Sequence, residues 1–174
     1  MTPQLVTAPQ DPVCSLDEMR THLRLDDTES DVELAALEAA AVGYLDGWRG
    51  VLGRAIVSQV WSQEFTGWGD LEIEMPDVAS FTVSGFDTED APVAASSSEL
   101  INTYAGPIVR CSGPAVSRVV VEYTVGMPAA QLKTAKVLVL LMVANWFDNR
   151  SGDAALELPA SARSLIEILR WRVI

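Results

Sequence analysis

The spacing of hydrophobic residues changes twice along this chain of 174 residues, and that change limits the folds it can adopt. Up to about residue 54, and again from Pro128 onward, apolar residues recur every three or four positions, as on one face of a helix. Between Ala55 and Gly126 the spacing is mostly two, which is typical of strands with one buried face. The sequence therefore predicts helices at both ends of the chain and strands in the middle.

The same spacing sets the expected bounds of each element. We predict helices over residues 15–25, 30–49, 129–149 and 159–171, and a β-region over 55–126. The helix 129–149 is apolar on nearly every side, which favours a central position. We therefore expect an α+β fold with a mainly helical core of about four helices and an inserted small antiparallel β-region.

Local motifs refine this prediction at three places. Residues 1–12, with three prolines, are expected to be a flexible N-terminal arm that precedes a single domain over 13–174. Ser15 with Glu18 and Ser30 with Glu33 match the capping box, so both helix starts are expected to be capped by side chains. Residues 87–118 lack a clear period, so we expect irregular strands joined by a mobile, exposed loop.

The charge of the chain excludes several partners. The formal net charge is −12, and acidic chains bind nucleic acid poorly because phosphate contacts require Lys and Arg. Residues 128–174 reverse the sign, with 4 acidic and 6 basic groups, so this part is expected to dock on an acidic protein surface.

The apolar run Val137–Ala144 is much shorter than the roughly 20 residues of a membrane span, so no membrane contact is expected. The N-terminus has no signal-peptide pattern, which predicts a cytoplasmic origin.

The sequence offers no group of residues suited to catalysis. His22 is the only histidine, and a surface or helix-packing role is expected for it. Asp27, Glu29 and Asp31 have the acid spacing of a calcium loop, but Val32 stands where that loop needs glycine. We therefore expect no enzyme activity, no catalytic residues, no metal site and no cofactor.

The cysteines and tryptophans have mainly structural interpretations. Cys14 and Cys111 are far apart in the sequence and are expected to be free thiols, although a disulfide stays open as an alternative. Three of the five tryptophans fall on apolar stripes and are expected in the core. Trp68, in a glycine turn, and Trp171, between Arg170 and Arg172, are the candidates for contacts with other proteins.

Several segments, in this order, resemble the head-tail connector or adaptor proteins of long-tailed bacteriophages and of phage-like gene transfer agents. The resemblance rests on the order and spacing of segments 12–26, 44–47, 53–55, 59–61, 121–126, 143–150, 158–159 and 169–172. It covers the chain from about residue 12 to its end and is weakest over 87–118. Such proteins are virion structural proteins of the neck, and the resemblance implies a homo-oligomeric ring of about a dozen copies between the portal and the stopper or tail protein. DNA would pass through the channel of that ring without specific binding.

Three sets of contact residues follow from this resemblance as expectations. The C-terminal helix and the end of the chain would contact the portal, through Arg163, Arg170, Trp171, Arg172, Val173 and Ile174. Small residues of the second helix would contact the next copy in the ring, through Ala35, Ala36, Ala39, Ala40 and Gly43. Acidic residues of the weakly patterned stretch would face the tail side, through Asp87, Glu89, Asp90 and Glu99.

Two other functions stay open at this point. A stopper or tail completion protein of the same particle would share the acidity and the mixed helix and strand pattern. A small-molecule-binding regulatory domain would instead show a well-formed apolar pocket and a stable monomer.

Overall fold

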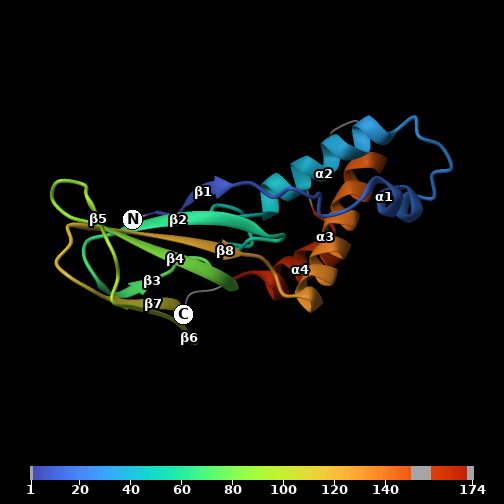
Figure 1. Ribbon diagram of the computed structural model, residues 1–174. Coiled ribbons are helices and arrows are strands. Elements are labelled where there is room, and N and C mark those ends of the chain that lie inside the picture. Colours follow the sequence, from blue (N-terminus) through green and yellow to red (C-terminus); the bar gives the residue numbers. More distant parts are fainter. Residues whose placement is uncertain (1, 150–157, 172–174) are drawn as a thin grey trace. The chain divides into compact units, whose positions relative to one another are not determined.

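A computed structural model describes residues 2–149 and 158–171 of the chain (Figure 1). Within these residues the strands are β1 (Gln4–Thr7), β2 (Gln59–Phe65), β3 (Gly69–Glu72), β4 (Val78–Phe86), β5 (Pro92–Val93), β6 (Ser97–Thr103), β7 (Gly106–Ser112) and β8 (Arg118–Val125). The helices are α1 (Leu16–Leu23), α2 (Asp31–Leu45), α3 (Ala129–Asp148) and α4 (Ala160–Leu169). Each helix lies inside one of the four ranges that the sequence predicts.

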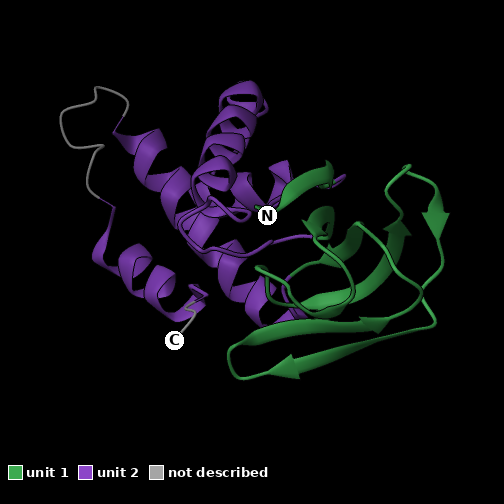
Figure 2. Ribbon diagram, turned by 90° about the vertical axis from the view of Figure 1, so that its left-hand side faces the viewer, with its two compact units in different colours: residues 1–9, 58–126, 172–174 green, residues 10–57, 127–171 purple. Residues whose placement is uncertain are grey.

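The chain divides into two compact units, coloured separately in Figure 2. Unit 1 consists of residues 1–9, 58–126 and 172–174 and contains all the described strands. Unit 2 consists of residues 10–57 and 127–171 and contains the described helices. The chain leaves unit 2 before β2 and returns to it after β8.

Unit 1 contains two antiparallel sheets. The larger has the strand order β1-β2-β8-β4-β5, and the smaller has the order β3-β7-β6. In the central strand β8, Val119, Val121, Tyr123 and Val125 are buried and alternate with more exposed residues, as strand geometry requires for a sheet with one covered face. This alternation is the clearest strand pattern in the sequence, and it forms the middle of the larger sheet.

A buried glutamine links the two sheets of unit 1. Gln63 of β2 donates from Nε2 to the carbonyl oxygen of Glu72 at the end of β3, and its Oε1 accepts from the Glu74 amide. The Tyr123 hydroxyl also donates to Gln63 Oε1, at 3.4 Å. A buried amide without partners would destabilise the fold, so these bonds explain why a polar residue stands among buried strand positions.

Trp68 has an internal role in unit 1. It lies in the segment between β2 and β3, and its Nε1 donates to the carbonyl oxygen of Pro114 at 2.6 Å. Its ring lies so close to Gly85 and Gly113 that a Cβ atom at either position would crowd it. The two glycines therefore provide the space in which the indole packs.

The core of unit 2 is formed by all four helices and the loop after α2. Helix α3 contributes five buried residues, Ala135, Leu138, Val139, Met142 and Val143. From α2 come Leu34, Ala41 and Leu45, from the loop Leu52 and Ile56, and from α4 Ala162, Ile166 and Leu169. The expectation that the helix at 129–149 packs centrally agrees with this arrangement.

The prediction of a mainly helical core with a small β-region is wrong. Helices make up 33% of the structure and strands 31%, and the strands form two sheets rather than one small insertion. The error comes from residues 87–118, where β6 and β7 pair over seven residue pairs without a register shift. Most residues of β6 are exposed, and a strand with no buried face leaves no alternating pattern to read.

Smaller differences concern the N-terminal segment and the second helix. Residues 1–12, expected to be a flexible arm, contain β1, which pairs with β2. Helix α2 ends at Leu45, four residues before its predicted end, because Gly47 adopts φ of 81° and bonds to Arg54 in a short bridge. The glycine conformation turns the chain back toward α2.

Candidate functional site

The predicted ring-contact residues all lie on the exposed face of α2. Ala35, Ala36, Ala39, Ala40 and Gly43 are exposed, and the opposite face of the helix is buried in the unit 2 core. A Cβ atom built on Gly43 would meet nothing within 4 Å. Val32, at the start of the same face, is 85% exposed. The face is therefore apolar, narrow and open to the approach of another helix.

The described portal-contact candidates lie on or just after α4. Arg163 and Arg170 are exposed, and Trp171 follows the end of the helix. Arg172, Val173 and Ile174, the other three candidates, lie outside the described residues. On the inner side of α4, Ile166 and Leu169 pack in the core. Helix α4 is therefore packed in the core on its inner side and exposes Arg163 and Arg170 on its outer side.

Two contacts fix the end of α4 to the loop after α2. The Trp171 amide donates to the carbonyl oxygen of Leu52 at 2.8 Å. Buried Arg54 donates from Nη1 to the carbonyl oxygen of Leu169 at 3.2 Å and from Nη2 to Gln131 Oε1 at 2.6 Å. Charged hydrogen bonds to a helix C-terminus satisfy its free carbonyl groups, so α4 ends in a defined place.

A groove lies between α4 and the C-terminal part of α2, with a volume of about 550 Å³. It is lined by Tyr44, Val51, Leu158, Arg163, Ile166, Glu167 and Arg170. Arg163, Ile166, Glu167 and Arg170 are three or four positions apart, so they lie on one face of α4 and its last turn. No local sequence pattern indicates this groove, because Tyr44 and Val51 lie more than 100 residues before the other lining residues.

Three of the four predicted tail-side acids, Asp87, Asp90 and Glu99, make side-chain contacts within the chain. Asp87 Oδ1 accepts from the amides of Glu89 and Ala91, which closes a tight turn between β4 and β5. Asp90 pairs with Arg118, whose guanidinium also contacts Glu64 and stacks on the Phe86 ring. The turn is thus fastened to the start of β8.

Glu99 lies apart from that turn, in the smaller sheet. It faces Arg110 of β7, which also binds Asp70 of β3 through two hydrogen bonds at 2.7 and 2.9 Å. The Arg110 guanidinium lowers the pKa of Asp70, so this pair stays ionised at neutral pH. The four predicted acids are therefore divided between a turn and a sheet face, and they form no single cluster.

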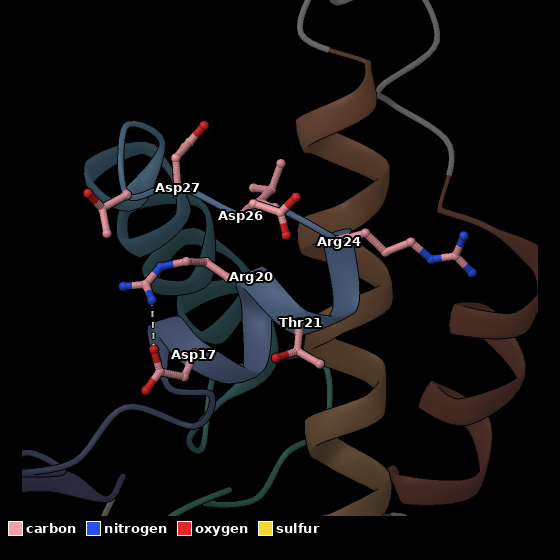
Figure 3. Close-up of a pocket in the computed structure, with 8 residues that line it drawn as sticks. Asp17, Arg20, Thr21, Arg24, Asp26 and Asp27 are labelled. Atoms are coloured by element: carbon pink, nitrogen blue, oxygen red, sulfur yellow. Dashed lines mark hydrogen bonds and ion pairs between the residues drawn. The ribbon is translucent and has the colours of Figure 1, made fainter.

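A polar pocket of about 440 Å³ lies where α1 leads into α2 (Figure 3). Arg20 is the central cation, but it is bound by Asp31 through two hydrogen bonds and by Asp17 through an ion pair. In Figure 3 the Arg24 side chain extends away from Arg20 and Asp17. Because Arg20 is already bound by two carboxylates, this central cation is not free to hold an anion in the pocket.

The remaining reactive groups are isolated from one another. His22 is exposed on α1 and lines a shallow hollow together with Asp17, Glu18, Thr21 and Leu140. Cys14 and Cys111 are free and buried, and burial raises the pKa of the Cys14 thiol to about 12. Over residues 2–149 and 158–171, no group of three or more His, Cys, Asp or Glu side chains is placed to hold a metal ion. None of the helices within those ranges is long and apolar enough to span a membrane.

Comparison with known proteins identifies similar chains in phage-like particles. No protein-family model and no curated protein matches this chain. Among solved structures, a chain from the neck of an empty gene transfer agent particle, computed with C6 symmetry, is 26% identical, with a TM-score of 0.68 over 100% of this chain and 98% of that one. A chain from the virion of the native gene transfer agent particle is 25% identical, with a TM-score of 0.64 over the same shares.

The likeness extends over the whole length of both chains, so it concerns the entire fold, including both units. It supports a structural protein of the neck of a phage-like particle. The predicted location in a virion or phage-like particle is confirmed.

Proposed function

We propose that this chain is a non-enzymatic head-tail connector, or adaptor, which forms a ring between the portal and the stopper or tail protein. The observation that carries the proposal is the likeness along the full chain to a protein of a gene transfer agent neck. The order of connector-like segments in the sequence supports it independently. The ring is proposed to contain about twelve copies.

The surfaces described above fit three neighbours of such a ring. The apolar face of α2 is proposed to contact the next copy, because a head-to-tail ring needs a complementary patch on each subunit. The basic end of α4, with the residues that follow it, is proposed to contact the portal. The acids Asp87, Glu89, Asp90 and Glu99 are proposed to face the tail side.

The acidity of the chain suits a protein that lines a channel through which DNA passes. The net charge is −12, and like charges repel the phosphate backbone. A channel lined with acids would keep DNA from adhering as it passes. We therefore propose that DNA passes through the ring without specific binding.

The location of the protein in its particle tests the proposal. Particles that carry this chain with a small visible tag should show the tag as a ring directly beneath the portal when imaged by electron microscopy. A tag next to the tail tube would instead identify a stopper or tail completion protein. Particles without the tag density at the neck would contradict both assignments.

A mass measurement tests the ring separately. Light scattering of the purified chain alone and of the chain bound to portal should give, in at least one of the two states, a mass near twelve copies. A stable monomer in both states would contradict the ring and favour a binding domain.

A further inference from the structure

The groove between α2 and α4 combines an apolar floor with two arginines. Val51 and Ile166 are largely buried, and Tyr44, 48% exposed, forms one wall. Arg163 and Arg170 are exposed seven residues apart on α4, so they stand two turns from each other along one side of the groove. Glu167 also lines the groove, so a fitting ligand would place apolar groups on the floor and acidic groups beside the two arginines.

Several arginines of this acidic chain already have partners within it. Arg20, Arg110 and Arg118 each bind at least one carboxylate. Buried Arg54 donates to a carbonyl and an amide oxygen. In the part of the chain that the structure describes, the Arg163 and Arg170 side chains have no ion pair or hydrogen bond. Among the same described residues Arg24 likewise has none, so what distinguishes Arg163 and Arg170 is that both line one groove with an apolar floor.

The groove is also held in a fixed shape. The Trp171 amide and the Arg54 guanidinium tie the end of α4 to the loop 52–54, which is adjacent to Val51. Ile166 packs in the unit 2 core. A preformed groove loses little conformational entropy when a partner binds, so its contacts contribute to affinity.

We propose that this groove binds an acidic segment of the portal protein, which places one apolar side chain against Val51 and Tyr44 and its carboxylates against Arg163 and Arg170. The proposal rests on the connector function and deepens it, because it names the chemistry of the portal segment and the residues that receive it. A volume of about 550 Å³ suits a few side chains of such a segment rather than a whole domain face. Charge complementarity of this kind favours fast and specific docking.

Matched double charge reversals test the proposal. R163E/R170E reverses both groove arginines, and R24E/K133E makes the same change in net charge at two exposed residues outside the groove. Each purified variant is mixed with portal-bearing heads, and the bound fraction is measured by co-sedimentation. We expect R163E/R170E to weaken joining about tenfold or more and R24E/K133E to change it less than about twofold. Tyr44→Ala, which removes the apolar wall, should weaken joining about fivefold.

Two further measurements identify the partner. Light scattering should give R163E/R170E the same ring mass as the wild type. Portal variants selected to restore joining of R163E/R170E should carry Lys or Arg in place of Asp or Glu within one segment. Circular dichroism melts must show that both double variants are folded.

Each contrary outcome has a distinct meaning. If folded R163E/R170E joins heads as well as R24E/K133E does, the groove proposal is wrong while the connector function stands. If R163E/R170E loses its ring, or if restoring changes fall in acids of this same chain, the groove receives a second copy and the portal assignment is wrong. If the wild type does not join portal-bearing heads at all, the connector function itself is wrong, and the groove proposal is overturned with it.

Discussion

Glu38 shows how one carboxylate can organise the start of a fold. It lies on the buried side of α2, only 8% exposed, and its Oε1 accepts from the amides of Val13 and Cys14 at 2.8 and 3.3 Å. These amides precede α1, so the bonds fasten the segment before α1 to the middle of α2. The sequence indicated nothing of this role, because an acid among alanines suggests an exposed position.

Replacing Glu38 by Leu should therefore destabilise unit 2. The change leaves two buried amides without an acceptor, so the free energy of unfolding should fall by about 2 kcal/mol or more. Glu38→Gln keeps an amide oxygen as acceptor and should lose less than half as much. Urea unfolding followed by circular dichroism measures both, and equal stability of E38L and wild type would contradict the role.

Two identical motifs at helix starts behave differently. At α1, Ser15 Oγ accepts from the Glu18 amide and Glu18 Oε2 accepts from the Ser15 amide, so the predicted capping box is confirmed. At α2, Ser30 makes no side-chain cap, so the second predicted box is wrong. The Ser30 backbone has ψ of 2° rather than the extended value of Ser15, which turns its hydroxyl away from the first free amides.

Gly85 gives a second prediction at this scale. A Cβ atom there would overlap the Trp68 ring and the carbonyl oxygen of Val93, so Gly85→Ala should lower the free energy of unfolding by about 1–3 kcal/mol. In a Trp68→Leu background the same change should cost at least about 0.5 kcal/mol less, because part of the overlap is gone. Denaturant unfolding of the wild type, G85A, W68L and W68L/G85A measures this difference in the free energy of unfolding. A purely additive cycle would show that Trp68 does not occupy the space above Gly85.

At the scale of elements, α2 has a buried face and an apolar face that nothing in its own unit covers. The buried face is Leu34, Glu38, Ala41 and Leu45. The three- and four-residue spacing that starts at Leu34 and Ala41 predicts that this face continues through Tyr44 and Trp48, but Tyr44 is half exposed and Trp48 lies beyond the end of the helix. The proposed ring contact at the exposed alanines can therefore be tested apart from folding, because changes there affect few contacts within the chain.

Substitutions on that face test the ring contact. Ala39→Glu should change the free energy of unfolding of the single chain by less than about 0.5 kcal/mol, as at other exposed positions. It should nevertheless prevent ring assembly, since a charge would be buried between copies. Light scattering and thermal melts measure the two effects.

Gly43→Ala serves as the matched control on the same face. Its new methyl group meets nothing within the chain, and alanine favours helix over glycine by about 0.8–1 kcal/mol. G43A should therefore melt at a higher temperature than the wild type. An A39E variant that still assembles to the wild-type mass would remove α2 from the ring contact.

The hairpin β6–β7 is the element that differs most from the sequence prediction. The sequence predicts irregular strands joined by a mobile, exposed loop over 87–118. Instead, β6 and β7 form a regular hairpin, and Asp70, Arg110 and Glu99 form a row of ion pairs across the three strands of its sheet. Cross-strand pairs of opposite charge stabilise such a sheet without any hydrophobic pattern. The spacing of apolar residues gives no indication of such charge pairs.

For the whole molecule, each unit contains one buried thiol that reports on its folding. Cys14 belongs to unit 2 and Cys111 to unit 1. Burial raises the pKa of Cys14 to about 12, so the reactive thiolate is almost absent in the folded unit. Both thiols become accessible only when their own unit opens.

Labelling of the single-cysteine variants C14S and C111S should follow the opening of each unit. At pH 8 and without denaturant, iodoacetamide should leave Cys14 unmodified over a period in which a free cysteine reacts fully. In urea, mass spectrometry should show labelling that rises with the unfolding of the corresponding unit. Rapid labelling of Cys14 in the native protein would contradict its burial.

The raised pKa also fixes the direction of one pH effect. Above its ordinary value of about 9 the Cys14 thiol ionises in the unfolded chain but stays protonated in the folded one. The contribution of this group is therefore fully present below pH 9 and is lost as pH rises toward 12. Removing the group in C14S should flatten that part of the stability curve.

The sequence alone determined the positions of the four helices, the central strand β8, one capping box and the absence of a catalytic motif, because these depend on local spacing and residue type. The tertiary structure decided the extent of the sheets, the burial of Glu38, the packing of Trp68 on Gly85 and the groove beside Arg163 and Arg170. Each of these depends on contacts between segments that are distant in sequence. Local periodicity cannot carry that information, since it records which face of an element is apolar and not what the element meets.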